Sequence, residues 1–167
     1  MQPLEIFDSL KGAFAEGELA FWHQAPSDPY VTVAPARLSD LCRVIRDRSD
    51  LSFDYLRCLS AVDLTERLAV VYHLFSLKLR HSLVLKVFLD RNVPEVASVQ
   101  DIWSAANWYE RAAFDLMGLT FIGHPDLARI MMPRDWVGHP LRKDYAQPTD
   151  YHGIPTVRPG NAGGSDA

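Results

Sequence analysis

The residues from Glu110 to Tyr145 constrain this chain more than any other part of it. They read ERAAFDLMGLTFIGHPDLARIMMPRDWVGHPLRKDY, and they follow no helical or strand period after Gly118. Long irregular segments inside a compact domain usually serve a function, and their backbone N–H and C=O groups need hydrogen-bond partners. We therefore predict that this stretch, the signature arm (residues 110–145), finds many of those partners on other protein chains.

Length and charge limit the possible classes of protein. The chain has 167 residues, which suits one domain with a sizeable core. Its net charge of −4 argues against an electrostatic nucleic-acid binder. No stretch approaches the length of an apolar membrane span, and the first residues lack the regions of a signal peptide. We expect neither a membrane-spanning segment nor a secretory leader.

The chain contains two cysteines, Cys42 and Cys58. Two isolated thiols form no disulfide framework and fit a reducing compartment. An iron–sulfur cluster typically needs four thiolate ligands, which this chain cannot supply alone. There is also no glycine-rich dinucleotide or phosphate loop, no nucleophile elbow and no Cys-x-x-Cys pair. We therefore expect this chain to bind no redox cofactor of its own.

Apolar spacing predicts two helices and one short strand in the first 50 residues. The first helix covers residues 3–15, because Pro3 suits the first helical position and apolar residues follow at helical intervals. Residues 30–33 form the strand. The second helix follows Pro35, and its buried face is predicted to carry Leu38, Leu41, Cys42 and Ile45.

Three runs of alternating or continuous apolar residues come next, at 53–62, 68–77 and 82–89. The connections between them are short and polar, so we predict that these strands pair as an antiparallel meander. A long helix follows, from a capping-box-like sequence at Ser98 to about residue 117, and Gly118 ends it.

These elements predict an α+β fold: a two-layer domain with a mostly antiparallel sheet, helices on one face and an irregular C-terminal arm. Residues 1–145 form a single domain that includes the signature arm. Residues 146–167 are rich in glycine and proline and hold little that could form a core. We predict that they are a tail, mobile or laid across a neighbour.

Three histidines in the last third invite a metal-site interpretation. His124, His139 and His152 could combine with Asp126 or Asp135, but their spacing fits no common zinc motif. The favoured alternative is that each His–Pro or His–Gly step shapes a turn and that the ring forms hydrogen bonds.

The sequence Gly-His-Pro occurs twice, at 123–125 and 138–140. Proline fixes its own φ and extends the residue before it, so each occurrence is a rigid kink. The kinks bracket apolar residues that no regular element carries, among them Met132 and Trp136. Burial against a second subunit would satisfy them, because Trp and Met are enriched in interface cores. The alternative is that they fold back onto their own sheet.

Charged side chains of the arm allow three interpretations. Arg129 and Arg142 could pin the arm to the long helix by pairing with Glu110 or Asp115. The run from Arg142 to Tyr145 could instead be a solvated cluster. A third hypothesis is a small stand-alone enzyme that uses Glu110, Asp115 and His124 as acid–base groups.

The arm resembles the signature of the 30 kDa subunit family of the proton-translocating NADH-quinone oxidoreductase (respiratory complex I). The likeness extends from about residue 50 to 155 and includes VVYHL, KVFL and VPEVASVQDIWSAANWYER upstream of the arm. The chain departs from the family pattern at Ala112, where a second Glu is usual, at Met117 and at Ala146. The matching residues are Glu110, Arg111, Phe114, Asp115, Gly118, Phe121, His124, Pro125, Leu127, Arg129, Ile130, Met131, Pro140, Leu141, Arg142, Lys143, Asp144 and Tyr145.

This resemblance implies a non-catalytic peripheral-arm subunit on the cytoplasmic side of the cell inner membrane. Such a chain supports a quinone-reducing module in which FMN, iron–sulfur clusters and quinone are bound by other subunits. Its implied partners are the quinone-site subunit, which is related to the hydrogenase large subunit, and the subunit with the terminal cluster. No nucleic acid is expected, and membrane association comes only through the complex. An equivalent scaffold in a membrane-bound hydrogenase complex is the alternative.

The resemblance also suggests which residues form the partner interface or hold the arm in shape. They are Glu110, Arg111, Asp115, His124, Pro125, Arg129, Met132, Trp136, His139, Arg142, Lys143, Asp144 and Tyr145.

Overall fold

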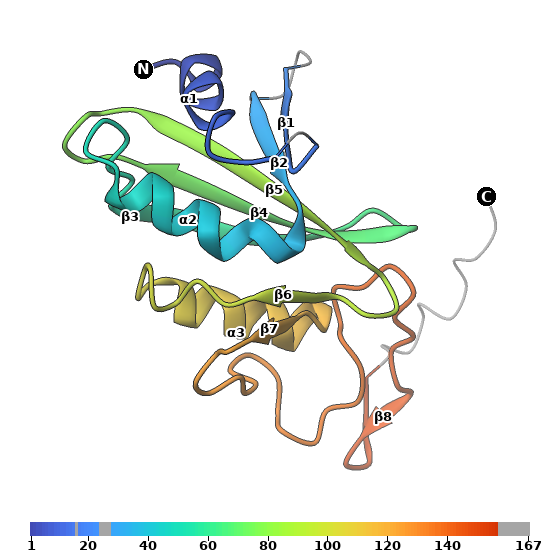
Figure 1. The fold of residues 1–167 in the computed structure, drawn as a ribbon. Helices are drawn as coiled ribbons and strands as arrows, with labels where there is room; N and C mark the ends of the chain where they lie inside the picture. The colour runs from blue at the N-terminus through green and yellow to red at the C-terminus, as the bar shows by residue number, and fades with distance from the viewer. Residues whose placement is uncertain (16, 24–27, 157–167) are drawn as a thin grey trace.

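The computed structural model of the chain describes residues 1–15, 17–23 and 28–156 (Figure 1). Its elements, in chain order, are α1 (Pro3–Leu10), β1 (Leu19–Trp22), β2 (Tyr30–Val33), the 3-10 helix η1 (Pro35–Arg37), α2 (Leu38–Asp47), β3 (Tyr55–Asp63), β4 (Arg67–Phe75), β5 (Ser82–Asp90), β6 (Glu95–Ala97), α3 (Ala106–Met117), β7 (Thr120–Ile122), β8 (Asp150–Tyr151) and β9 (Ile154–Pro155). None of the described helices is long and apolar enough to cross a lipid bilayer.

Five strands form the main sheet, in the order β1-β2-β5-β4-β3. The predicted antiparallel meander is confirmed, because β3 pairs with β4 and β4 with β5 in antiparallel register. The β2 strand joins β5 in parallel, while β1 pairs with β2 in antiparallel register. The sheet is therefore mixed but mostly antiparallel. Strand β1 was not predicted, because its four residues are all apolar and show no alternation, unlike β2 of the same length.

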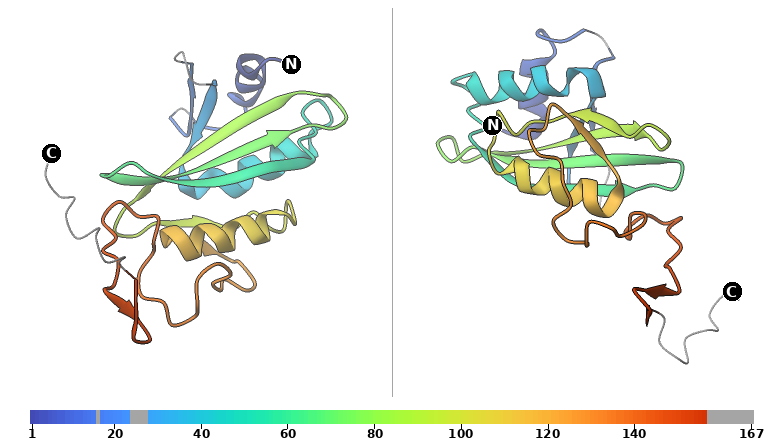
Figure 2. Two further views of the ribbon diagram at one scale, coloured as in Figure 1. Left: turned by 180° about the vertical axis from the view of Figure 1, so that it is seen from behind. Right: turned by 90° about the horizontal axis from the view of Figure 1, so that it is seen from below.

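Alternation along the strands separates a buried face from an open one. In β5, the side chains of Leu83, Leu85, Val87 and Leu89 are almost fully buried, whereas their neighbours are half-buried or exposed. The buried face packs against the apolar sides of the helices, as in α2, where Leu38, Leu41, Cys42 and Ile45 are inaccessible. Each such leucine contributes about 2 kcal/mol through burial. The predicted α+β fold with helices on one face is thus confirmed (Figure 2).

The first helix is shorter than the sequence predicts. It ends at Leu10 instead of residue 15, and the chain continues through turns in which the Ala13 amide donates to the Leu10 carbonyl. Gly12 lies in this stretch and weakens a helix by about 1 kcal/mol relative to Ala. Leaving the helical path lets Phe14 pack against the core.

The predicted start of the long helix at Ser98 is wrong, because α3 begins at Ala106. Residues 98–105 form turns, and the Trp103 indole N–H donates to the carbonyl of Phe53 at 2.9 Å. Ser98 does not cap the helix. Its hydroxyl donates to the carboxylate of Glu110 at 2.6 Å, and the amide of Val99 donates to the same carboxylate at 2.8 Å.

Two short strands, β6 and β7, lie before and after α3, and the sequence does not predict them. Strand β6 pairs in parallel with β7, so the chain before α3 lies beside the chain after it. Three-residue strands are too short to show an alternation. Gly118 ends α3 in the left-handed conformation, with φ of 71°, as its position predicts.

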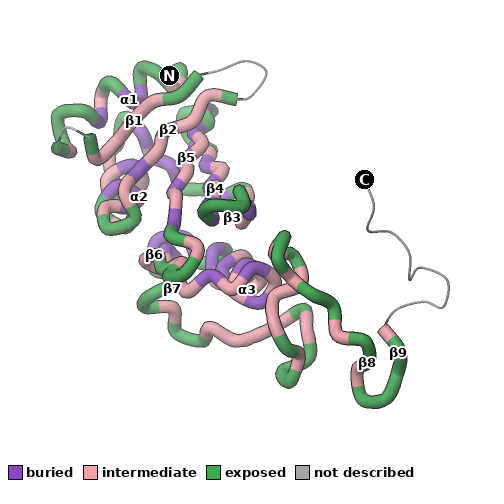
Figure 3. The backbone as a smooth tube through the Cα atoms, turned by 90° about the vertical axis from the view of Figure 1, so that its right-hand side faces the viewer, coloured by how far each residue is buried: buried purple, intermediate pink, exposed green. Residues whose placement is uncertain are grey.

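Burial falls sharply beyond β7. The chain from 122 onward is half-buried or exposed, and it returns to the end of β3 at Lys143 before the β8–β9 hairpin, which lies at its outer end (Figure 3). The predicted tail begins at 146, and this hairpin occupies part of it. Residues 157–167 of the predicted tail lie outside the described residues.

Glu110 provides a test of the junction between α3 and β6. Its side chain is fully buried, and burial raises its pKa to about 7 even though Ser98 and Val99 donate to it. Because the folded state holds this proton more tightly than the unfolded state, stability falls as pH rises from about 4.5 to 7. The free energy of unfolding of Glu110→Gln should not fall in this way. Relative to the wild type, this variant should therefore become more stable by on the order of 3 kcal/mol as pH rises from 4 to 8.

The measurement is urea denaturation at pH 4, 6 and 8. Glu110→Ala is the control, because it leaves the Val99 amide and Ser98 hydroxyl without their acceptor and should cost about 1–3 kcal/mol at every pH. Parallel stability curves for the wild type and Glu110→Gln would show that Glu110 does not titrate in this range.

Candidate partner interface formed by the signature arm

One carboxylate organises the centre of the signature arm. Asp115 lies on α3 with its side chain fully buried, and its Oδ2 accepts the backbone amides of three consecutive residues. These amides belong to Ile130 at 2.9 Å, Met131 at 2.7 Å and Met132 at 2.9 Å. A buried carboxylate is tolerated only when its oxygens accept several donors. Asp115 therefore accepts the hydrogen bonds that the backbone amides of this turn would otherwise donate to a strand or helix partner.

Arg129 completes this cluster. Its guanidinium donates to Asp115 Oδ1 at 2.8 Å and to the carbonyl of Gly138 at 3.0 Å. The predicted pairing of Arg129 with Asp115 is confirmed. Burial by itself would raise the pKa of Asp115, but the three amides and Arg129 outweigh it and hold this pKa below its usual value. Asp115 is consequently ionised and acts as an acceptor.

The second Gly-His-Pro kink, at 138–140, is held by the close approach of the His139 ring to Gly118 at the end of α3. His139 lies against Gly118, where an added Cβ would come within 2.5 Å of the imidazole ring. His139 Nδ1 hydrogen-bonds the Asp115 carbonyl at 3.0 Å, and the Leu141 amide donates to the carbonyl of Leu116 at 3.0 Å. Only glycine offers both the left-handed backbone and the space at position 118. The arm thus crosses the C-terminal end of α3 in van der Waals contact.

The predicted pairing of Arg142 with a carboxylate of α3 is wrong. Its Nε donates to the carbonyl of Met117 at 2.9 Å, one of the unpaired carbonyls at the helix C-terminus. A cation at that end also interacts favourably with the helix dipole. Arg142 therefore holds the arm to α3 through backbone groups, which explains why no acidic partner is needed.

A second buried carboxylate, Asp63 at the end of β3, anchors the end of the arm. It accepts two bonds from Arg91, at 2.6 and 3.1 Å, and the amide of Lys143 at 2.9 Å. Arg91 also pairs with Asp144 at 2.9 Å. Arg91 holds the pKa of Asp63 well below its usual range, and it lowers that of Asp144 as well. The run from 142 to 145 is thus an ordered attachment and not a solvated cluster.

Asp63 and Arg91 were not predicted from the sequence as parts of this site. Asp63 is 80 positions from Lys143, and nothing in the local sequence of a strand end marks it as an anchor. Only the sheet, which brings the ends of β3 and β5 together, makes the cluster possible.

The first Gly-His-Pro kink lies beside the start of α3. His124 Nε2 hydrogen-bonds the carbonyl of Asn107 at 3.2 Å, and its Nδ1 accepts the amide of Asp126 at 3.1 Å. Arg111 donates to the carbonyl of Ala128 at 3.1 Å and packs over the ring of Trp108. Pro125 is exposed. Both ring nitrogens of His124 are thus in use, which supports a turn-shaping role.

The three candidate acid–base groups do not converge. Glu110 points inward to Ser98 and Val99, Asp115 binds the amides of the arm, and His124 bonds the backbone near the start of α3. Within residues 1–15, 17–23 and 28–156, no group of three or more His, Cys, Asp or Glu side chains could hold a metal ion. The geometry gives the stand-alone enzyme hypothesis no common site.

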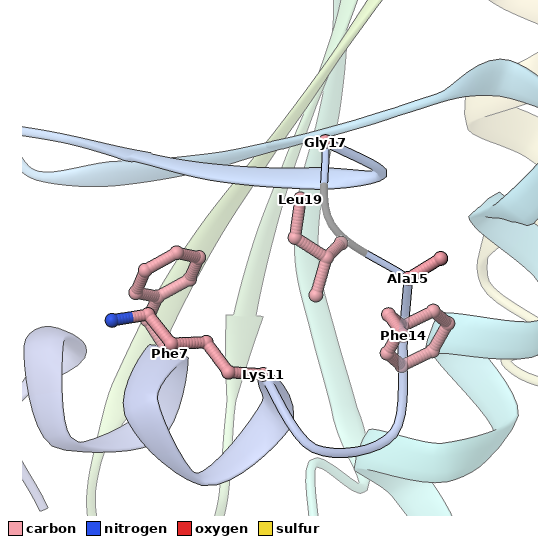
Figure 4. Close-up of a pocket in the computed structure, with 6 residues that line it drawn as sticks. All are labelled: Phe7, Lys11, Phe14, Ala15, Gly17 and Leu19. Atoms are coloured by element: carbon pink, nitrogen blue, oxygen red, sulfur yellow. The ribbon is translucent and has the colours of Figure 1, made fainter.

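An apolar pocket of the domain also lies away from these residues. It has a volume of about 300 Å³ between α1 and the start of β1 (Figure 4). Among the described residues, its lining holds neither a carboxylate nor an imidazole, and Lys11 pairs with Asp8. The lining residues are Phe7, Lys11, Phe14, Ala15, Gly17 and Leu19.

Apolar side chains of the arm divide into packed and exposed groups. Trp136 and Met132, which were predicted to contact a partner, are both half-buried. The Trp136 indole donates to the hydroxyl of Tyr145 at 3.0 Å and packs against Tyr151 at 5.1 Å. Three other apolar residues of the irregular part of the arm are well exposed: Met131 at 64%, Val137 at 79% and Leu141 at 60%. These three are the clearest candidates for burial by a partner.

Asp115→Asn should destabilise the chain by about 3 kcal/mol, because the Asn amide faces the Arg129 guanidinium and leaves that charge unpaired. The matched control is Asp126→Asn, whose carboxylate is 69% exposed and lies 3.5 Å from Arg111, a surface pair worth less than about 1 kcal/mol. Thermal and urea unfolding measure both variants. Equal effects would show that Asp115 is not the centre of the arm.

Because Asp63 holds the end of the arm as an anion, this attachment should weaken in acid. Its pKa is lowered by folding, so it contributes stability above the unfolded pKa of about 4, and that contribution is lost as pH falls. Asp63→Asn should therefore be less stable than the wild type at pH 7, and the difference should shrink between pH 4 and pH 2. Urea titrations followed by Trp fluorescence test this. A difference independent of pH would mean that the ionised carboxylate is not what holds the arm.

Known proteins resemble this chain over most of its length. Residues 31–151 match the family described as "Respiratory-chain NADH dehydrogenase, 30 Kd subunit". The chain is 38% identical over 156 residues to an NADH-quinone oxidoreductase subunit from Chlorobium phaeobacteroides, and the match covers 92% of this chain and 94% of that one. It is 46% identical over 120 residues to the equivalent subunit from Roseiflexus castenholzii, with 70% and 69% covered.

Two solved structures share the fold. One is the trypsin-resistant fragment (1–134) of Nqo5, with a TM-score of 0.64 and 25% identity, covering 76% of this chain and 100% of the fragment. The other is the membrane-bound sulfane sulfur reductase, an archaeal respiratory membrane complex, with a TM-score of 0.65 and 22% identity over 86% and 85% of the two chains. At that identity the second likeness concerns the fold alone. From the family match and the identity over nearly its whole length, this chain belongs to the 30 kDa subunit family of the respiratory-chain NADH dehydrogenase.

Proposed function

We propose that this chain is a non-catalytic subunit of the peripheral arm of an NADH-quinone oxidoreductase. The α+β domain acts as a rigid platform, and the signature arm docks on sister subunits. Electrons pass from NADH through FMN and iron–sulfur clusters to quinone on those other subunits, coupled to proton translocation. The resemblance and the names of the relatives support this proposal.

The observation that carries the proposal is an irregular arm that is held rigidly yet leaves apolar side chains exposed. Asp115 and Asp63 fix the arm from within. Met131, Val137 and Leu141 nevertheless remain in solvent. Three exposed apolar side chains on one fixed segment fit a surface that a partner covers. Fixing the arm beforehand reduces the ordering cost of association.

The proposed partners are the quinone-site subunit, which is related to the hydrogenase large subunit, and the subunit with the terminal cluster. An obligate interface of this kind should bury more than about 2,000 Å² in total. We place the chain on the cytoplasmic side of the inner membrane, attached through the complex. The same geometry would serve a membrane-bound hydrogenase complex, but the relatives' names favour the NADH-quinone enzyme.

The double variant Met131→Asp/Val137→Asp tests the docking surface. Both side chains are exposed, so the isolated chain should melt within a few degrees of the wild type. Buried carboxylates without partners oppose association, so recovery of the assembled complex should fall at least tenfold. NADH-quinone activity in membranes should fall in proportion.

Leu77→Asp is the matched control, because this leucine is 61% exposed in the turn after β4, away from the arm. It should leave assembly unchanged. A double variant that assembles in normal amounts but loses turnover would overturn the scaffold proposal in favour of a catalytic role.

A further inference from the structure

The face of the main sheet opposite the helices carries a group of cations and aromatic rings. The strand register places Lys86 opposite both Thr32 and Val71, and Phe88 opposite Ala69. Lys86 and Phe88 alternate with the buried residues of β5, so they lie on the other face of the sheet. Viewed from behind, the strands lie in front of α2, and none of the described helices covers them (Figure 2, left). The exposed arm residues Met131, Val137 and Leu141 are not part of this sheet face, although the end of the arm reaches the β3–β4 turn near Arg67, where Lys143 bonds Asp63 and Thr65.

Two of the cations pack on rings of this face. The Arg67 guanidinium lies 3.8 Å from the centroid of the Phe88 ring. The Lys86 ammonium lies 5.5 Å from the same centroid and 4.8 Å from that of Tyr30. Lys86 and the two rings are half-buried, while Arg67 is exposed. Both charges are therefore held in defined positions over apolar surface.

Neither cation forms an ion pair within the described part of the chain. Asp90 is the cross-strand partner of Arg67, where an ion pair would be expected. Its carboxylate instead accepts the amide of Asn92 at 2.7 Å. A guanidinium stacked on a ring keeps its N–H edge available for a bidentate carboxylate. The charges on this face are thus held in position without an ion-pair partner among the described residues.

Apolar surface surrounds the two charges. Val71 and Val84 are half-buried near Lys86, and His73 lies beside Val84. Trp22 and Tyr55, at the two outer strands, are 45% and 47% exposed. Aromatic residues and arginine are characteristic of the centres of protein–protein interfaces. Three cations, counting Arg57 over the Phe75 ring at 5.7 Å, are also too few for nucleic acid, where binding depends on many phosphate contacts.

We propose that this face is a second docking surface and that its occupant is a segment of another subunit with carboxylates among apolar residues. One carboxylate pairs with Arg67 and a second with Lys86, while the apolar residues between them cover Val71 and Val84. The chain as a whole carries a net charge of −4, so this local excess of positive charge selects an acidic partner. The inference rests on the chain working as a subunit, but it uses a different surface from the arm.

The test is made on the complex purified with this chain. A water-soluble carbodiimide joins an amine to a carboxylate with loss of water, and it should link Lys86 to an Asp or Glu of another subunit. Acetylation of Lys86 by an N-hydroxysuccinimide ester should fall at least tenfold in the complex relative to the isolated chain. Lys78, which is exposed in the turn between β4 and β5, is the internal control and should change less than twofold.

Charge reversal gives an independent measurement. Arg67→Glu/Lys86→Glu should lower recovery of the assembled complex at least tenfold, while the isolated variant keeps the wild-type melting temperature within a few degrees. Arg43→Glu/Lys78→Glu changes the net charge equally at exposed positions off this face and should have no effect. Reversing the cross-linked carboxylate of the partner to Lys should restore assembly with the first variant.

Three results would overturn the proposal. Lys86 could be acetylated equally in the complex and in the isolated chain, or cross-linked only to a second copy of this chain. The isolated chain could bind a fluorescent oligothymidylate that the double variant does not bind. If this chain still copurifies with the complex, each of these results leaves the proposed role of the arm unchanged. If this chain is absent from the purified complex, both proposals are contradicted.

Discussion

The arrangement of the signature arm depends on one buried carboxylate. Asp115 gathers three backbone amides and a guanidinium, and without it an irregular turn would have no partner for those groups. Removing a carboxylate from water is costly, and four donors offset that cost. Gly118 and His139 then set the path of the chain across the end of α3, and Arg142 joins it to the Met117 carbonyl at the helix end. These contacts give the arm a defined path although it has no regular secondary structure.

Three acidic side chains behave differently because their surroundings differ. Burial with two donors leaves Glu110 with a raised pKa. Asp115 is also buried, but four donors including Arg129 lower its pKa. The pKa of Asp63, with Arg91 as its partner, is held well below its usual range. Two of these acids hold the arm as anions, while the third stabilises the junction of α3 with β6. Rigidity that comes from within the chain leaves the outer surface of the arm available to partners.

Much of the fold could be predicted from the sequence. Alternation over 68–77 and 82–89 predicted the paired strands, and helical spacing predicted the buried face of α2. The prediction failed where local signals were short or ambiguous. Ser98 resembled a helix cap, but its hydroxyl binds Glu110 twelve positions away. Strands β6 and β7 were too short to show a period, and β1 is apolar throughout.

The sequence by itself determined the class of fold, the family likeness, and the irregularity of the arm, because each depends on residue type and spacing along the chain. The pairing of Arg129 with Asp115 was also within reach, since Glu110 and Asp115 are the acids of α3. Tertiary structure alone decided that Asp63 and Arg91 hold the end of the arm and that Arg67 and Lys86 share one open face. Those groups meet only after the sheet has formed, so their spacing along the chain does not predict these contacts.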